Sequence, residues 1–164
     1  MKTAVEDALA PLVNRRLLTP KRALDLVTFS VEADEESTLV LHVQCPWRIV
    51  MRTEILVAQS DFYRPSADDL PEFAYDNCEA GTRWQDVRLE ALAVRWGAHG
   101  VRIRSVAVDA FGGFELHLVG GFRLDVFPDS SVKPGKDYEF WRLFGGTNPH
   151  FVVGPNSARH DADV

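Results

Sequence analysis

Two Gly-Gly pairs constrain the fold of this chain more than any other feature of its sequence. Gly112-Gly113 and Gly120-Gly121 separate three runs in which apolar and polar residues alternate, at residues 101–108, 114–119 and 122–127. Alternation with period two is typical of half-buried strands. Glycine also supplies the positive φ angles that tight hairpin turns require. The sequence therefore predicts an antiparallel meander in this region.

Further strands are predicted by the same alternation on both sides of the meander. They lie at residues 27–31, 39–43, 47–51, 55–59, 138–144 and 150–153. Cys45-Pro46 separates two of them, because proline cannot donate a hydrogen bond to a ladder. The acidic run at 32–37 is expected to form a solvated hairpin loop.

Two segments have helical spacing instead. Residues 3–12 place Val5, Leu9 and Leu12 on one side of a short helix. Residues 83–96 form the second predicted helix, whose apolar residues at helical spacing are Trp84, Val87, Ala91 and Val94. Thr82 and Gln85 match a capping box at its start, and Gly97 follows its end.

Hairpins combined with two helices predict an α+β fold dominated by an antiparallel sheet. At 164 residues the chain is expected to form one domain over residues 1–154, followed by a flexible polar tail at 155–164. A gapless overlay of residues 39–49 on 114–124 matches His42 with His117 and Arg48 with Arg123. This similarity indicates an internal duplication of a helix plus hairpins, although any two hairpins share alternating apolar residues.

Charge and composition exclude several classes of partner. The net charge is −6, which is opposite to the basic surface of nucleic-acid-binding proteins but compatible with a basic protein partner. No apolar run reaches the roughly 18 residues of a membrane span, and no signal-peptide core is present. The two cysteines match no metal or redox spacing. We expect a cytoplasmic protein without a membrane or nucleic-acid role.

No motif in the sequence defines a catalytic, metal or cofactor site. Cys45 follows His42 by three residues, but activation of a thiolate needs a base within hydrogen-bond reach, and no third orienting group accompanies this pair. The Gly-Gly pairs do not open a helix, as phosphate-binding loops do. We therefore predict no catalytic residue, no metal ligand and no cofactor.

Acidic and aromatic residues supply the candidate contacts with a partner or ligand. The segment 60–81 lacks periodicity and reads as a long surface excursion, a kind of loop that often serves a function. Acidic runs raise association rates with basic partners, although they are also typical of solvated faces. The candidates are Asp34, Glu35, Glu36, His42, Trp47, Arg48, Phe62, Tyr63, Asp68, Asp69, Tyr75, His117, Trp141, Arg142 and His150.

Four segments carry a resemblance to other proteins: LHVQCPWRI at 41–49, VFPDSS at 126–131, EFWRLF at 139–144 and HFVV at 150–153. In these motifs the chain resembles an uncharacterised bacterial family of small acidic proteins. In size and style it also resembles immunity proteins found beside polymorphic toxins. The resemblance implies no established chemistry and carries over no catalytic residues.

The sequence leaves two functions open. The first is a non-enzymatic protein-binding module, immunity-like toward a toxin, that uses the acidic loops and the excursion from Asp61 to Tyr75. The alternative is a small-ligand binder or enzyme whose groove is lined by His42, Arg48, Trp141 and His150. A homodimer formed through exposed strand edges is compatible with both.

Overall fold

The structure is a computed structural model that describes residues 1–23, 26–32, 38–68, 79–130, 138–145 and 148–161. It confirms the α+β fold and the predominance of antiparallel strands. The helices are α1 (Lys2–Leu9) and α2 (Trp84–Trp96), with 3₁₀ turns η1 (Ala10–Leu12), η2 (Gln59–Tyr63) and η4 (Val119–Gly121). The strands are β1 (Arg16–Leu17), β2 (Lys21–Ala23), β3 (Leu26–Glu32), β4 (Thr38–Val43), β5 (Trp47–Met51), β6 (Glu54–Ala58), β7 (Val101–Val108), β8 (Phe114–Leu118), β9 (Phe122–Val126), β10 (Trp141–Gly145), β11 (Asn148–Gly154) and β12 (Ser157–Asp161).

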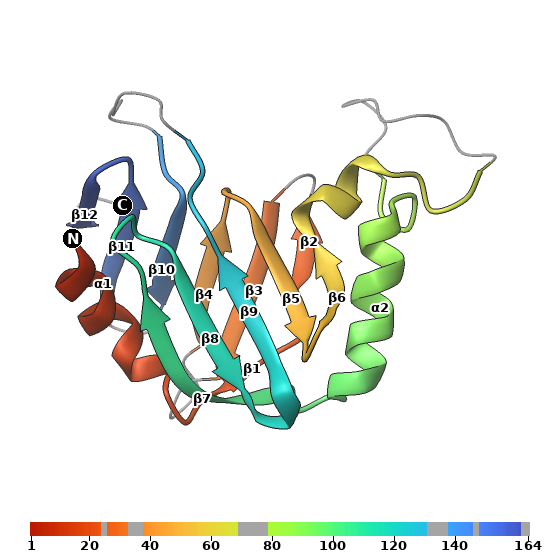
Figure 1. Ribbon diagram of the computed structural model, residues 1–164, viewed down its shortest axis with the longest axis horizontal. Coiled ribbons are helices and arrows are strands. Elements are labelled where there is room, and N and C mark those ends of the chain that lie inside the picture. Colours follow the sequence, from red (N-terminus) through yellow and green to blue (C-terminus); the bar gives the residue numbers. More distant parts are fainter. Residues whose placement is uncertain (24–25, 33–37, 69–78, 131–137, 146–147, 162–164) are drawn as a thin grey trace.

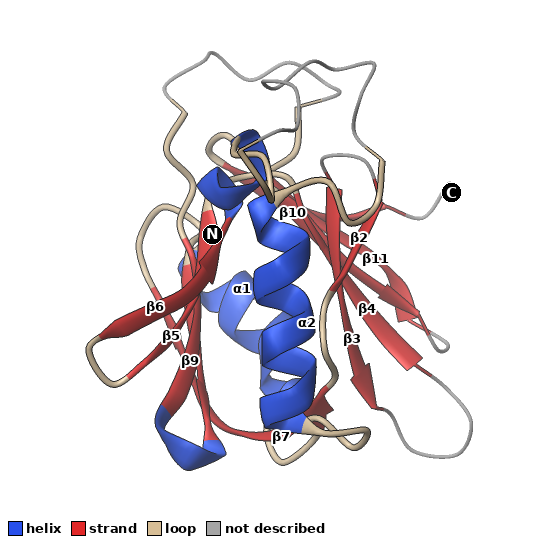
Figure 2. Cartoon of the chain, turned by 90° about the vertical axis from the view of Figure 1, so that its right-hand side faces the viewer, coloured by secondary structure: helices blue, strands red, loops and turns tan. Residues whose placement is uncertain are grey.

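The strands form one hydrogen-bonded sheet in the order β12-β11-β10-β4-β3-β1-β7-β8-β9-β5-β6, with β2 beside β3. The sheet bends at β1 and β7, so that its two halves face each other (Figures 1 and 2). We call β7, β8, β9, β5 and β6 the front half, and β3, β4, β10, β11 and β12 the back half. The helices lie between the halves (Figure 2), at opposite ends of the molecule (Figure 1).

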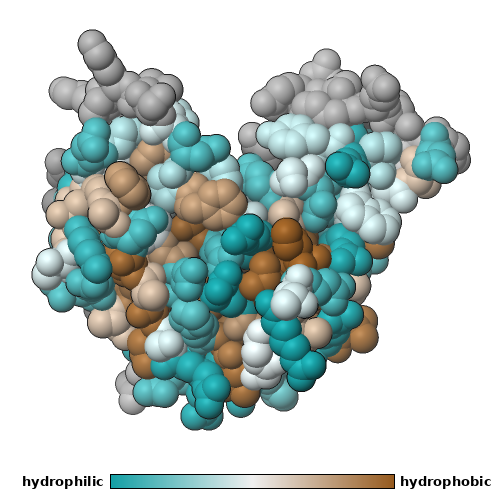
Figure 3. Space-filling model, viewed as in Figure 1, coloured by the Kyte–Doolittle hydropathy of each residue, from teal (hydrophilic) through white to brown (hydrophobic). Residues whose placement is uncertain are grey.

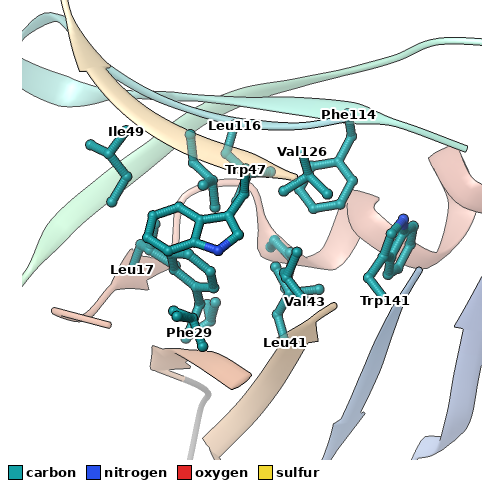
Figure 4. Packing of buried hydrophobic residues seen from close by; sticks show 14 of the residues in the cluster. Leu17, Phe29, Leu41, Val43, Trp47, Ile49, Phe114, Leu116, Val126 and Trp141 are labelled. Carbon is teal, nitrogen blue, oxygen red and sulfur yellow. The ribbon is translucent and has the colours of Figure 1, made fainter. Parts of the chain in front are cut away.

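The core fills the space between the two halves. Trp47 of β5 meets Phe29 of β3 edge to face, with ring centroids 5.2 Å apart. Phe114 of β8 meets Trp141 of β10 in the same way at 5.1 Å (Figure 4). Because successive side chains of a strand point to opposite faces, the polar residues that alternate with these core residues point away from the core. The outer faces of the sheet therefore carry the polar chemistry.

Helix α2 buries a face different from the one that its apolar repeat indicates. Its buried residues are Gln85, Leu89, Leu92 and Trp96. The repeat of Trp84, Val87, Ala91 and Val94, which we call the helix stripe, is exposed, and Val94 reaches 85% exposure. The repeat therefore predicts the helix correctly and its orientation wrongly.

The start of α2 is capped by Asp86 instead of the predicted pair of Thr82 and Gln85. The Asp86 carboxylate accepts hydrogen bonds from the backbone N–H groups of Gly81 and Arg83 at 2.9 and 3.2 Å. Thr82 donates its hydroxyl to the Glu79 carbonyl. A carboxylate in the first turn satisfies unpaired donors and complements the helix dipole.

Gln85 and Arg88 of α2 cover the free edge of β6, the last strand of the sheet. The Gln85 Nε2 group donates to the Ala58 carbonyl at 3.0 Å, and Arg88 Nε donates to the Leu56 carbonyl at 2.6 Å. Unpaired edge carbonyls invite pairing with foreign strands, and natural proteins cover such edges. The polar Gln85 is therefore buried because it faces the edge of the sheet.

The internal duplication does not extend to the pairing of the strands. β8 pairs with β9 in a hairpin, whereas β4 pairs with β3 and β10, and β5 crosses to the front half to pair with β6 and β9. The proline at the crossing, Pro46, explains why β4 and β5 separate. Equivalent positions do meet once, because Ile49 pairs directly with Leu124.

The predicted C-terminal tail contains a strand. Residues 155–164 are predicted to be flexible, but Ser157–Asp161 form β12, which pairs with β11 from Gly154↔Ser157 to His150↔Asp161. A tight turn at Asn156, with φ of 56°, returns the chain onto β11.

Neither α-helix that the structure describes has the length and apolar character needed to cross a bilayer.

Candidate functional site

Three of the aromatic candidates are core residues. Trp47 and Trp141 fill the space between the halves, and Phe62 is buried in η2. The Trp141 indole donates to the Gly112 carbonyl at 2.7 Å. These side chains offer no surface to a partner, which corrects the expectation that they form contacts.

Five of the loop candidates lie outside the described residues: Asp34, Glu35, Glu36, Asp69 and Tyr75. Tyr63 and Asp68, at the described start of the excursion, are exposed. Backbone hydrogen bonds tie the two ends of the excursion together, from Ser66 N–H to the Thr82 carbonyl at 3.0 Å and from Trp84 N–H to the Arg64 carbonyl at 2.9 Å. The excursion therefore leaves and returns to one place beside the first turn of α2.

A buried ion pair anchors this place to the back half of the sheet. Arg22 of β2 donates to both Asp86 oxygens, at 2.7 and 2.8 Å, and its guanidinium lies over the Phe62 ring, 5.1 Å from the centroid. Burial alone would raise the pKa of Asp86, but the hydrogen bonds from Arg22 and from the helix start lower it below its ordinary value. The carboxylate thus stays ionised and holds three segments together.

The predicted residue Arg48 belongs to a charged network on the outer face of the front half. Asp125 of β9, which is 5% exposed, accepts hydrogen bonds from Arg48 at 2.8 Å and from Arg123. Burial would raise the pKa of Asp125, but these two guanidinium groups lower it below the usual value. Arg48 pairs directly with Asp125 across the two strands, and Arg123 lies two residues before Asp125 on β9, so both arginines reach this carboxylate.

A hollow of about 390 Å³ opens beside this network at one end of β7, β8 and β9. Arg48, Glu115, Asp125 and Phe127 contribute to its lining. The Arg48 guanidinium lies over the Phe127 ring at 5.5 Å from the centroid, and that ring is exposed. The charge of the Asp125 carboxylate is already paired with two arginines, so this hollow offers little unpaired charge to a new partner.

The three candidate histidines divide between the two outer faces. His117 of β8 pairs with Glu115 at 3.0 Å on the front half. His42 of β4 and His150 of β11 lie on the back half, where both rings contact Phe144, with centroids 4.6 and 4.8 Å from it. Burial and the charge of Arg142 lower the pKa of His42, which favours its neutral imidazole.

Arg142, the remaining candidate, is engaged within its own strand region. It donates to both oxygens of Glu139, at 2.9 and 3.0 Å from its Nε, and Gln44 donates to the same carboxylate. A bidentate pair of this kind is geometrically specific and holds both side chains in place. Arg142 thus braces the start of β10 against the end of β4.

The four residues of the predicted ligand groove do not meet. His42 and His150 lie on the outer face of the back half, Arg48 lies on the outer face of the front half, and Trp141 lies between them in the core. Cys45 is buried, and burial raises the pKa of its thiol to about 12, so it is no nucleophile near neutral pH. The described residues contain no group of three or more potential metal ligands.

The surface that sequence reasoning missed is the helix stripe. Figure 2 shows α2 at the front of its side of the molecule, with no other described element over its outer face. Trp84 is 38% exposed and its ring contacts the Arg88 guanidinium, 5.8 Å from the centroid. The available signal was a second apolar set at helical spacing, Leu89, Leu92 and Trp96. Gln85 obscured it, because a polar side chain ordinarily indicates an exposed position.

The chain matches no family model, no curated protein and no solved structure.

Proposed function

We propose that this protein is a non-enzymatic protein-binding module whose contact surface is centred on the helix stripe. The observation that carries the proposal is the exposure of Trp84, Val87, Ala91 and Val94 on one face of α2. Contiguous exposed apolar side chains are typical of interaction surfaces, and tryptophan and tyrosine are enriched at their energetic centres.

The partner is a basic protein that presents an apolar patch. Glu90 is exposed beside the stripe on α2, and the exposed Asp68 and Glu79 lie at the described ends of the excursion. With the net charge of −6, these carboxylates favour a rim of lysine and arginine on the partner. A toxin neutralised by an immunity-like protein is one partner of this chemistry.

The alternative, a small-ligand binder or enzyme, loses its basis in the predicted groove. The hollow that Arg48 lines contains none of His42, Trp141 and His150. Catalysis requires its groups within hydrogen-bond reach of one reacting atom, and the bent sheet keeps these four apart.

The experiment compares proteins captured from the native lysate by the wild type, by Val94→Asp and by Phe111→Asp. Phe111 is also exposed, at 73%, but lies in the turn between β7 and β8 and serves as the matched control. We expect wild type and Phe111→Asp to capture one basic protein. When that protein is purified and its affinity for each variant is measured, Val94→Asp should bind it at least about tenfold more weakly than wild type.

Added salt is expected to slow association without abolishing the complex, because only the charged rim is screened. Equal capture by wild type and Val94→Asp would contradict the proposal, as would capture of nothing. If sedimentation shows that wild type forms a self-complex and Val94→Asp does not, the partner is a second copy of the chain and not a foreign protein.

A further inference from the structure

A second hollow, of about 240 Å³, lies at the opposite end of the outer face of the front half. Its polar lining consists of Arg52, Arg104, Arg123 and His117, which we call the arginine hollow. Its walls are Val50, Leu118, Gly121 and Phe122. Among the residues that the structure describes, none that lines it is acidic, although the chain as a whole carries a net charge of −6.

Four separate segments bring these basic side chains together. Arg104 comes from β7, His117 from β8, Arg123 from β9 and Arg52 from the turn between β5 and β6. These strands are neighbours in the sheet, and hydrophilic side chains gather across the middle and lower part of this face (Figure 3). The convergence therefore depends on the sheet order and is invisible in any one segment.

Arg52 and Arg104 differ from the other two basic residues of the hollow in their ion pairing with the described part of the chain. Arg123 is paired with Asp125 and lies 3.9 Å from Glu115, and His117 is paired with Glu115. Arg52 and Arg104 form no ion pair with any residue in the described ranges. Like charges gathered without compensation repel one another, and a bound anion relieves this repulsion.

Arg52 lines the hollow although its backbone conformation is unfavourable for a residue other than glycine. Arg52 has φ of 55°, in the left-handed region that glycine adopts more readily. Its N–H donates to the Gly121 carbonyl at 3.3 Å, which joins the β5–β6 turn to the β8–β9 turn. A glycine would suit this turn better for folding, so the arginine is the residue to test for a separate role.

We propose that the arginine hollow binds the phosphate group of a small organic phosphate monoester. Guanidinium groups present paired N–H donors that match the oxygens of a phosphate and stay charged at all physiological pH values. The partly exposed ring of Phe122, beside Val50, is the apolar wall that receives the organic part, whereas Leu118 is 2% exposed and belongs to the core. This site lies on a different face from the helix stripe, so it does not depend on the proposed protein-binding function.

Titration calorimetry with phenyl phosphate, inorganic phosphate and benzoate tests the site. We expect saturable binding of phenyl phosphate, weaker binding of inorganic phosphate and the weakest binding of benzoate, all reduced by added salt. Arg104→Ala and Arg52→Gly should each weaken phenyl phosphate binding at least about tenfold, because each removes a charge-assisted hydrogen bond.

Arg102→Ala is the matched control, since Arg102 is an exposed arginine on the same strand, two residues from Arg104 and outside the hollow. It should leave the affinity within about twofold of wild type, as expected for a substitution outside the site. An equal loss in Arg102→Ala would show general charge attraction and overturn the proposal. Absence of saturable binding of phenyl phosphate by the folded wild type would overturn it as well.

Discussion

Two buried tryptophans differ in a single hydrogen bond, which makes them a matched pair. Trp47 is 1% exposed and its indole N–H has no partner among the described residues, whereas the Trp141 N–H is bonded to Gly112. Trp141→Phe should lower the free energy of unfolding by about 1–3 kcal/mol more than Trp47→Phe, because it leaves a buried carbonyl unpaired. Urea unfolding of both variants measures the difference. Equal losses would mean that the bond to Gly112 contributes nothing.

The buried thiol of Cys45 should be inert in the folded protein. With a pKa of about 12, almost no thiolate is present at pH 8. In a Cys78→Ser background, where Cys45 is the one remaining cysteine, we expect no reaction with a disulfide reagent until urea unfolds the chain. Rapid labelling without urea would show that β4 and β5 open at their junction.

Residue patterns identified outward and inward positions along each strand, but not their neighbours. Alternation puts Arg48, His117 and Arg123 opposite the leucines and isoleucines, and the structure confirms this placement. Arg52 and Arg104 were missed because neither is unusual within its own segment. Their proximity depends on β7, β8, β9 and β5 lying side by side, and that order is decided by contacts distant in sequence.

The contact between α2 and the edge of β6 yields a prediction at the level of elements. Arg88→Met keeps the apolar stem of the side chain but removes the donor to the Leu56 carbonyl. We expect a loss of about 1 kcal/mol in the free energy of unfolding, together with faster hydrogen exchange in β6. Arg95→Met, at an exposed position on the same helix, should stay within about 0.5 kcal/mol of wild type. The idea fails if the two variants behave alike.

Elements with strong periodicity were predicted well, and short or edge elements were not. The two helices and the strands from β3 to β11 follow the predicted segments within a few residues. β1 and β2 are only two and three residues long, too short to show any period. β12 reads as a polar tail, because an edge strand at the surface needs few apolar residues. The orientation of α2 failed for a related reason, since its buried face carries the polar Gln85.

Stability of the whole molecule should fall in acid through two carboxylates. The pKa values of Asp86 and Asp125 are lowered in the folded state from the ordinary value of 3.8. Their stabilisation is therefore fully present above the unfolded pKa and is lost as the pH falls through the lower folded pKa. Unfolding measured from pH 6 down to pH 2 should show this decline.

Asp125→Asn and Asp86→Asn provide the check on this acid dependence. Each should be less stable than wild type at pH 6 and should lose less stability on acidification, because the titrating group is gone. A variant with an acid dependence as steep as that of wild type would show that other carboxylates govern acid unfolding. Wild type and variants must be compared at one salt concentration, since screening weakens charge pairs.

The crossing of the chain at Pro46 also affects the order in which the protein is completed during its synthesis. β4 pairs with β10, and β5 pairs with β9, so both partners are made long after the strands that need them. Pairings so distant in sequence form slowly, and until they form the open edges of the β3–β4 and β5–β6 hairpins are prone to aggregate. As the chain leaves the ribosome, β3 and β4 can pair with each other, but the apolar side of that hairpin stays exposed to solvent until most of the polypeptide has emerged.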